Sequence, residues 1–211
     1  MKSRKKLLRG SRLYVLIDKV ISGKKSVIES AKKIRGNGAD IVQLRDKISK
    51  KERILQDAFL MQGLFSNTDT LFVINDHLDI AKIADCDGLH IGQDDIPIEI
   101  ARRVLGKDKI IGVSCRSIKQ ALEAQDRGAD YVGIGPIFPT PAKPGYKAIG
   151  LDSIGVLSKK MRIPFFVIGD VNLKNIDRVK KAGANRVAVC RAVLQAKDIA
   201  RSTRGFSRIL N

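Results

Sequence analysis

Charged side chains stand directly after several β-rich runs of the 211-residue sequence. Two carboxylates, Asp76 and Asp95, follow neighbouring runs, and three cations, Arg45, Lys47 and Lys143, belong to the same set. Mg²⁺ takes one or two protein carboxylates and fills its octahedron with water and phosphate oxygens. Cations and Mg²⁺ together also stabilise the charge that develops on a departing diphosphate. Ordinary loop-end charges would explain any one of these residues, but their concentration at successive run ends favours a site for Mg²⁺-bound phosphate or diphosphate.

Other chemistries find little support in the sequence. The two histidines, His77 and His90, have no second His or Cys at metal-ligand spacing. We expect His77 to begin a helix, and His90 to pack inside the protein or to support a site residue from behind. No Ser lies in a GxSxG elbow, which argues against a hydrolytic triad. The GxGxxG and GxxxxGK[ST] phosphate loops are absent as well.

The three cysteines, Cys86, Cys115 and Cys190, form no CxxC pair and match no zinc pattern. We expect three reduced thiols, as in a reducing compartment. Cys115 and Cys190 each end a β-rich run, so a role in a site stays open for them.

Eight β-rich runs alternate with helical patterns along the chain. Strands that alternate with helices predict βαβ units and a parallel sheet. Eight units favour a single (β/α)₈ TIM barrel of the α/β class, with its active site at the carboxyl ends of the strands. A doubly wound open sheet, which usually has fewer strands, is the alternative. The predicted strands are Leu13–Asp18, Asp40–Arg45, Leu71–Asn75, Gly88–Ile91, Lys109–Ser114, Tyr131–Gly135, Pro164–Ile168 and Arg186–Cys190.

A repeated tripeptide introduces three of these runs: Gly38-Ala39-Asp40, Gly128-Ala129-Asp130 and Gly183-Ala184-Asn185. Asp87-Gly88 is a weaker fourth copy. The Gly would end the preceding helix in a left-handed conformation, and the short polar residue would turn the chain into the strand. Ser117 is the expected N-cap of the helix before the second copy.

Composition indicates one globular domain, because 44% of the residues are hydrophobic. We expect a basic extension at residues 1–12, a solvated tail by default, before a barrel domain at residues 13–211. The net charge is +18, but most basic residues are scattered, and three Tyr without Trp offer few stacking platforms for a nucleic acid. No apolar run suits a membrane span or a signal peptide, so we expect a cytoplasmic protein. The oligomeric state stays open, a homo-oligomer included.

The longest irregular segment runs from Gly135 to Gly145 and contains Thr140 and Lys143. Its Pro and Gly content predicts a loop, and long barrel loops often cover active sites. A bare connector is the alternative.

Five short motifs, most of them at the end of a β-rich run, stand along the chain in this order: Gln43-Leu44-Arg45-Asp46-Lys47, Ile74-Asn75-Asp76, His90-Ile91-Gly92-Gln93-Asp94-Asp95, Gly112-Val113-Ser114, and Gly135-Pro136-Ile137-Phe138-Pro139-Thr140 followed by Lys143. With them the chain resembles the thiamine-phosphate synthase family, and its relative thiazole tautomerase, from Leu13 to about Leu194. The family is a (β/α)₈ barrel that joins hydroxymethylpyrimidine diphosphate to a thiazole phosphate. The products are thiamine phosphate and diphosphate. The resemblance implies a Mg²⁺-assisted dissociative transfer, in which diphosphate departs before the thiazole nitrogen captures a pyrimidine-stabilised cation.

The resemblance also implies roles for residues of this sequence. Asp76 and Asp95 would hold Mg²⁺, the implied cofactor. The diphosphate would be held by Arg45, Lys47, Asn75 and Lys143, and the pyrimidine would face Gln43 and Ser114. The thiazole phosphate would be held by Thr140, Gly169, Asp170, Cys190 and Arg191. The residues expected to carry catalysis are Arg45, Lys47, Ser114 and Lys143.

Three departures from the family gather in the thiazole half. Ala142 stands where the family commonly has Thr or Ser, Asp170 where it has Gly, and Arg191 where it often has a small hydroxyl residue. A carboxylate beside a phosphate is unfavourable unless it is neutralised. We therefore expect Arg191 to contact the thiazole phosphate or to pair with Asp170. Which thiazole phosphate is accepted stays open.

Two other functions remain as alternatives. One is a diverged relative such as a tautomerase, and the other is a protein that binds phosphate ligands or nucleic acid without catalysis. The retained aspartates and diphosphate cations argue against the tautomerase.

Overall fold

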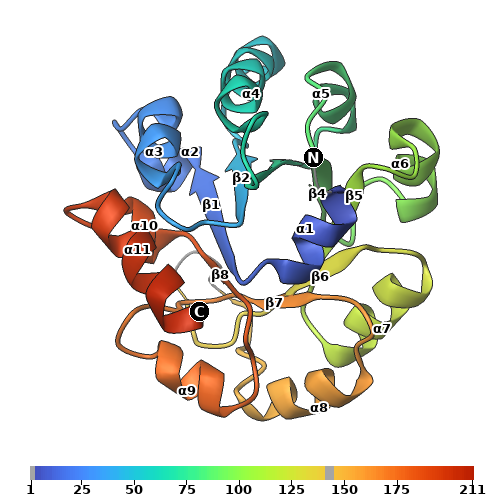
Figure 1. Ribbon diagram of the computed structural model, residues 1–211. Helices are drawn as coiled ribbons and strands as arrows, with labels where there is room; N and C mark the ends of the chain where they lie inside the picture. The colour runs from blue at the N-terminus through green and yellow to red at the C-terminus, as the bar shows by residue number, and fades with distance from the viewer. Residues whose placement is uncertain (1–2, 141–144) are drawn as a thin grey trace.

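Eight parallel strands close into a barrel in the structure, a computed structural model that describes residues 3–140 and 145–211. Each strand pairs with its neighbours in sequence, and β8 pairs with β1. Closure confirms the predicted TIM barrel and excludes an open doubly wound sheet. Figure 1 shows the strands inside a ring of helices. The strands are β1 (Leu13–Asp18), β2 (Ile41–Arg45), β3 (Leu71–Asn75), β4 (Gly88–Ile91), β5 (Ile110–Cys115), β6 (Tyr131–Ile134), β7 (Phe165–Val167) and β8 (Val187–Val189).

Helices α2 to α11 follow the strands along the chain and form the ring outside the barrel, whereas α1 precedes β1 (Figure 1). Within residues 3–140 and 145–211, no helix combines the length and the apolar character needed to cross a membrane. The helices are α1 (Arg4–Gly10), α2 (Lys19–Ser22), α3 (Val27–Ile34), α4 (Lys51–Phe65), α5 (Leu78–Ile83), α6 (Ile98–Leu105), α7 (Ile118–Asp126), α8 (Asp152–Lys160), α9 (Ile176–Lys181), α10 (Arg191–Leu194) and α11 (Ile199–Leu210).

Short polar side chains begin several of these helices. The Ser117 hydroxyl accepts a hydrogen bond from the Gln120 backbone N–H at 3.2 Å, which confirms the predicted N-cap of α7. The Asp198 carboxylate does the same for Arg201 at the start of α11, at 2.9 Å. Each bond satisfies a backbone donor that has no partner within the helix.

The tripeptide repeat ties each strand to the strand before it. The Asp40 carboxylate accepts hydrogen bonds from the backbone N–H groups of Arg12 and Leu13, both at 2.8 Å. Asp87 accepts from Phe72 at 2.9 Å, and Asp130 accepts from Ile111 at 2.8 Å. These backbone groups lie where the ladder begins, so the carboxylates satisfy donors near the amino end of the barrel.

The glycines of the repeat fulfil their expected role. Gly38, Gly128 and Gly183 adopt φ values of 89°, 92° and 104°, in the left-handed region that favours glycine. Each lies shortly after the end of a helix, where the chain must reverse into the next strand.

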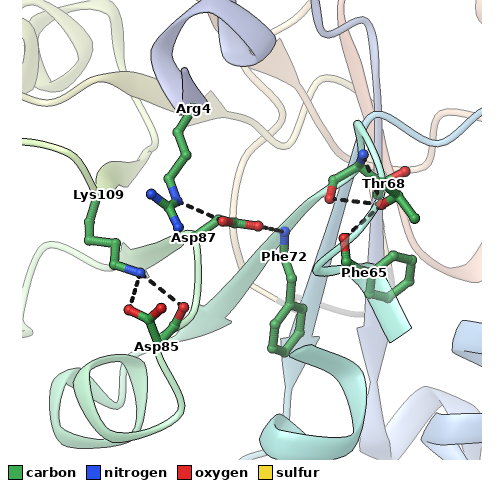
Figure 2. A network of polar contacts seen from close by, with 8 residues as sticks. Arg4, Phe65, Thr68, Phe72, Asp85, Asp87 and Lys109 are labelled. Atoms are coloured by element: carbon green, nitrogen blue, oxygen red, sulfur yellow. Dashed lines mark hydrogen bonds and ion pairs between the residues drawn. The ribbon is translucent and has the colours of Figure 1, made fainter. Parts of the chain in front are cut away.

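Residues 4–10 form helix α1 in place of the solvated tail expected by default. Leu8 is buried and packs with side chains inside the barrel. Arg4 forms an ion pair with Asp87 at 2.7 Å, and Lys5 with Asp130 at 3.2 Å. Figure 2 shows the Asp87 carboxylate between Arg4 and the backbone of Phe72. The helix forms because carboxylates remote in the sequence neutralise two of its cations, Arg4 and Lys5, while Leu8 is buried. Helix α1 thus covers the amino end of the barrel (Figure 1).

Substitution of Leu8 by Ala tests this docking. We expect the free energy of unfolding to fall by about 2 kcal/mol, because the change removes a buried side chain and leaves a cavity. Urea denaturation followed by circular dichroism measures it. The control is Leu60→Ala on α4, where Leu60 is 56% exposed and the loss should stay within about 0.5 kcal/mol. Equal losses in the two variants would show that α1 does not dock.

Candidate active site

Six of the predicted site residues line one cavity of about 480 Å³ at the carboxyl end of the barrel, which we call the main cavity. They lie at or just after the carboxyl ends of four successive strands, β2 to β5. Because the strands are parallel, their carboxyl ends meet at one end of the barrel and gather side chains remote in sequence. The six residues are Arg45, Lys47, Asn75, Asp76, Asp95 and Ser114.

A second, smaller cavity of about 100 Å³ adjoins the main cavity, because both are lined by Gly135 and Ile168. We call it the small cavity. It brings together all the residues expected at the thiazole phosphate. They are Thr140, Gly169, Asp170, Cys190 and Arg191. Two further positions that the sequence singles out, Ala142 and Lys143, lie outside the described residues.

The expected pairing of Arg191 with Asp170 is confirmed. A terminal nitrogen of Arg191 lies 2.5 Å from the Asp170 carboxylate and 3.4 Å from the Thr140 hydroxyl. Asp170 adopts a φ of 50°, a left-handed conformation that Asp tolerates better than most residues. The Arg191 guanidinium thus offsets the carboxylate that this chain places in the small cavity.

Arg45 is held in place by a carboxylate that the sequence did not single out. A terminal nitrogen of Arg45 forms a short ion pair with Asp18, and Asp18 is buried. The two residues face each other in the register of β1 and β2. Asp18 also caps α2 by accepting from the Ile21 N–H at 3.0 Å. Its position at the end of a predicted strand, beside the strand that carries Arg45, was the signal that could have revealed it.

Arg116 and Tyr146, to which the sequence assigned no role, also line the main cavity. The Arg116 guanidinium lies 4.6 Å from the centroid of the Tyr146 ring, within the range of a cation–π contact. It is also 3.8 Å from the Asp94 carboxylate. Arg116 directly follows β5, so the strand-end rule would have found it. Tyr146 follows the irregular loop, where no local pattern marks it.

The two carboxylates of the main cavity lie in contrasting surroundings. Burial raises the pKa of Asp76, the ion pair with Lys47 at 2.9 Å opposes that rise, and the neighbouring Asp95 carboxylate adds to it. Asp95 accepts a hydrogen bond from the Gly92 backbone N–H at 2.6 Å. Two neighbouring carboxylates repel each other unless a proton or a cation lies between them. This pair therefore favours a bound cation.

The donor set fits a hard cation held with few protein ligands. Within residues 3–140 and 145–211, no three His, Cys, Asp or Glu side chains gather at metal-binding spacing. A metal here would rest on Asp76 and Asp95 and take its other ligands from water or substrate. Mg²⁺ is commonly bound in this manner, through one or two carboxylates together with phosphate oxygens.

A chain of buried hydrogen bonds runs from Gln43 to Ser114 beneath the main cavity. The Gln43 amide nitrogen lies 2.6 Å from the Tyr14 hydroxyl, which lies 2.9 Å from the Tyr131 hydroxyl. His90 bridges Tyr131 at 3.0 Å and the Ser114 hydroxyl at 2.9 Å. Burial raises the pKa of both tyrosines, so both hydroxyls stay protonated at neutral pH. The expectation that His90 supports a site residue is confirmed, because it fixes the Ser114 hydroxyl.

Gln43 lies deeper than the sequence suggests. It does not line the main cavity, and its amide oxygen is buried without a hydrogen-bond partner among the described residues. Gln43 and Arg45 point to the same side of β2, but two residues of a strand span roughly 6.6 Å. Gln43 is therefore part of the floor beneath Arg45, connected to Ser114 through the buried chain.

Two glycines make room for this floor. A Cβ at Gly112 would overlap the Tyr131 ring, and a Cβ at Gly133 would lie 3.4 Å from the His90 ring. Glycine in a strand often marks such a close approach. The glycine of the Gly112-Val113-Ser114 motif is therefore required by packing beneath the site.

The three cysteines are free thiols. Burial raises the pKa of Cys86, Cys115 and Cys190 to about 12. A thiol with such a pKa is protonated at neutral pH and is a poor nucleophile. Cys190 is thus a lining residue of the small cavity, and the chemistry of the site has to proceed without a protein nucleophile of this kind.

The fold and the two cavities define a class of protein: a TIM-barrel enzyme whose carboxyl end is equipped for phosphate-bearing ligands. Comparison with known proteins narrows the class. The model of the thiamine monophosphate synthase family matches residues 13–193. The solved structure of thiamine phosphate pyrophosphorylase from Pyrococcus furiosus is similar, with a TM-score of 0.86 and 33% identity over 98% of this chain and 96% of that one.

Two curated relatives named thiamine-phosphate synthase agree with this result. One, from Halalkalibacterium halodurans, is 38% identical over 96% of this chain and 97% of its own length. The other, from Thermosynechococcus vestitus, is 41% identical over the whole chain, which spans 59% of that longer relative. The chain belongs to the thiamine-phosphate synthase family. It is therefore an enzyme, a transferase of thiamine biosynthesis.

The carboxylate pair predicts that the negative charge of Asp76 lowers the free energy of unfolding of the protein. We expect Asp76→Asn to raise the free energy of unfolding by about 1 kcal/mol at pH 7 in EDTA, because it removes a half-buried charge next to Asp95. Asn also tolerates the φ of 62° at this position. Urea denaturation across a pH series measures the difference.

The sign of the pH dependence follows from the raised pKa of Asp76. The folded protein binds this proton more tightly than the unfolded chain, so its stability falls as pH rises from the ordinary aspartate pKa to the folded value. The advantage of the Asn variant should accordingly disappear near pH 3, where the carboxyl is protonated in both states. A variant less stable than the parent at pH 7 would contradict the interpretation.

Proposed function

We propose that the enzyme joins 4-amino-2-methyl-5-hydroxymethylpyrimidine diphosphate to a thiazole phosphate, with Mg²⁺ as cofactor, and releases thiamine phosphate and diphosphate. The observation that carries the proposal is the main cavity itself. It combines a carboxylate pair, Asp76 and Asp95, with the cations Arg45 and Lys47, and it adjoins a small cavity that contains Arg191. One cavity suits a metal-bound diphosphate and the other a second anionic group.

The diphosphate would lie between the carboxylate pair and the cations. Mg²⁺ held by Asp76 and Asp95 would supply positive charge to the diphosphate oxygens as the leaving group departs. Arg45, fixed by Asp18, offers a planar pair of donors, and Lys47 offers a mobile ammonium. Asn75 would donate through its amide. Lys143, outside the described residues, is expected to add a further cation.

The reaction needs stabilisation of charge more than it needs a protein nucleophile. The bond between the pyrimidine methylene carbon and the diphosphate oxygen breaks first, and the electron pair leaves with diphosphate. The thiazole nitrogen then forms the new carbon–nitrogen bond. Ser114, held by His90 at 2.9 Å, would orient the pyrimidine by a hydrogen bond, above a floor that includes Gln43. The protonated thiols and the buried His90 agree with a route that requires no strong base.

The thiazole phosphate would occupy the small cavity. Arg191 and Thr140 offer donors there, and Gly169 and Cys190 are among the other lining residues. Asp170 is the unusual member, because its carboxylate competes with the phosphate for the Arg191 guanidinium. The acceptor phosphate would bind Arg191 at the cost of this ion pair.

The proposed reaction is tested by mixing purified protein, Mg²⁺ and both substrates and following thiamine phosphate. We expect product that disappears with EDTA. Asp95→Asn keeps an acceptor for the Gly92 N–H but removes the charge, and it should lower the rate by at least about a hundredfold. Asp177→Ala on the exposed side of α9 serves as the control and should retain the parental rate.

Three outcomes would contradict the proposal. No product with the pyrimidine diphosphate still bound would indicate a diverged enzyme with another acceptor. Isomerisation of a thiazole phosphate without transfer would indicate a tautomerase. Ligand binding without any turnover would indicate a phosphate-binding protein.

The competition in the small cavity gives a separate prediction. Asp170→Gly should lower the Michaelis constant for the thiazole phosphate several-fold with little change in kcat, since it frees Arg191. Arg191→Gln should raise the same constant by about tenfold, as expected for the loss of a charge-assisted hydrogen bond. Steady-state kinetics with saturating pyrimidine diphosphate measures both. An unchanged constant in both variants would exclude these residues from the acceptor site.

A further inference from the structure

A third cavity, of about 510 Å³, lies at the opposite end of the barrel from the active site. We call it the basic cavity. Its wall is formed by α1 on one side and by the segments that lead into β6, β7 and β8 on the other. These segments contribute Asp130, Arg162 and Arg186, and α1 contributes Lys5 and Arg9. None of these residues takes part in the proposed reaction.

The charges around the basic cavity are unbalanced. Four cations, Lys5, Arg9, Arg162 and Arg186, line it together with one carboxylate, Asp130. That carboxylate is already engaged by Lys5, by Arg102 and by the backbone N–H of Ile111. Arg162 is paired with Asp126, a carboxylate outside the lining, at 3.0 Å. Within residues 3–140 and 145–211, Arg9 and Arg186 are therefore the two lining cations without a carboxylate partner.

Arg186 is the lining cation whose lack of a carboxylate partner among the described residues is clearest. Its terminal nitrogens donate to neutral oxygens, the Asn185 side chain at 3.0 Å and the Arg9 carbonyl at 2.9 Å. Its Nε is buried without an acceptor, and within residues 3–140 and 145–211 it forms no ion pair with a carboxylate. Burial lowers its pKa, and the nearby Arg12 lowers it further. A half-buried cation of this kind gains free energy from an anion nearby.

The tripeptide repeat explains why negative charge is missing beside Arg186. Asp40, Asp87 and Asp130 place a carboxylate before β2, β4 and β6, and the last two neutralise cations of α1. The corresponding position before β8 is Asn185, which carries no charge. The cavity therefore lies where the pattern of the chain omits its carboxylate.

The basic cavity also lies under the weakest seam of the barrel. β7 and β8 share a single register pair, Val167 with Val187, whereas β1 and β2 share five. Arg162 precedes β7 and Arg186 precedes β8. An anion held between them would bring the starts of the two strands together and attach α1 to both through Arg9.

We propose that the basic cavity binds a small phosphorylated anion carrying two or more negative charges. Arg9 and Arg186, which lack a carboxylate partner among the described residues, and the partly neutralised Lys5 and Arg162 suit one such ion in a volume of this size. The extended backbone of a nucleic acid would need a longer open track. The site is independent of the proposed function, because it lies at the other end of the barrel and shares no lining residue with the main or the small cavity.

Binding of inorganic triphosphate to the full chain, measured by isothermal titration calorimetry in EDTA, tests the proposal. The Lys47→Ala variant is the background, so that binding at the active site is weakened in every sample. Arg9→Ser/Arg162→Ser should weaken binding at least tenfold and abolish the rise in melting temperature that triphosphate causes. Arg9 is exposed and the Arg162 side chain is 76% exposed, so both changes should preserve the fold.

A second variant addresses the missing carboxylate. Asn185→Asp should also weaken triphosphate binding about tenfold, since it supplies Arg186 with the counter-ion that the other copies of the repeat already carry. The matched control is Arg35→Ser/Arg103→Ser, which removes two exposed arginines that do not line the cavity. It should bind as the background does.

Three results would overturn the proposal. The first is unchanged binding in the cavity variants. The second is equal weakening in the control, which would indicate diffuse attraction to a +18 protein. The third is displacement of triphosphate by a short single-stranded oligonucleotide that binds with higher affinity. The thiamine phosphate assay is independent of all three, so failure of the synthase reaction and failure of this site are distinguishable.

Discussion

Closure of the sheet is the constraint on which the other features of this protein depend. A parallel sheet leaves unpaired backbone groups along its edges, and they are satisfied here when β8 returns to β1. Closure sends alternate side chains into the interior and collects all carboxyl ends at one end of the barrel. At the amino end, where the ladders begin, Asp40, Asp87 and Asp130 accept the backbone donors of the preceding strands. The carboxylates of the repeat thus accept hydrogen bonds from backbone N–H groups near the start of the ladder.

The interior becomes more polar from one end of the barrel to the other. Tyr14, Tyr131 and Phe166 form an aromatic layer, with ring centroids 5.4 to 5.8 Å apart. The two tyrosine hydroxyls begin the hydrogen-bond chain that passes through His90 to Ser114. Apart from the Gln43 amide oxygen, the hydrogen-bonding groups of this chain have partners, and such a floor holds its side chains in one arrangement.

The distribution of carboxylates decides where positive charge remains available. The chain has 40 basic and 22 acidic residues, so many cations have no partner of their own. Asp18 fixes Arg45 and Asp170 fixes Arg191 at the carboxyl end, while the repeat neutralises Arg4 and Lys5 of α1 at the amino end. Asn185 is the exception in this pattern. Arg186 beside it has no carboxylate partner in the described part of the chain and lines the basic cavity. The placement of carboxylates relative to cations thus determines the charge at the acceptor site, at the docked α1 and at the proposed anion site.

The eight strands could be predicted from the sequence within one residue at each end, because buried parallel strands are short apolar runs and the repeat marks where three of them begin. The grouping of Arg45, Lys47, Asn75, Asp76, Asp95 and Ser114 followed from the rule that parallel strands end together. Helix α1 could not be predicted, because its stabilising partners are remote in the sequence. Leu8 packs against apolar side chains of the barrel, and Arg4 and Lys5 pair with Asp87 and Asp130.

The sequence by itself determined the barrel and the composition of its active end, since strand period and strand order fix which residues meet there. The tertiary structure decided which carboxylate holds which cation. It placed Asp18 against Arg45 and Gln43 in the floor of the site, and among the residues that the structure describes it gave Arg186 no counter-ion. The reason is that these relationships depend on the stagger and depth of neighbouring strands, and no local pattern along the chain records either quantity.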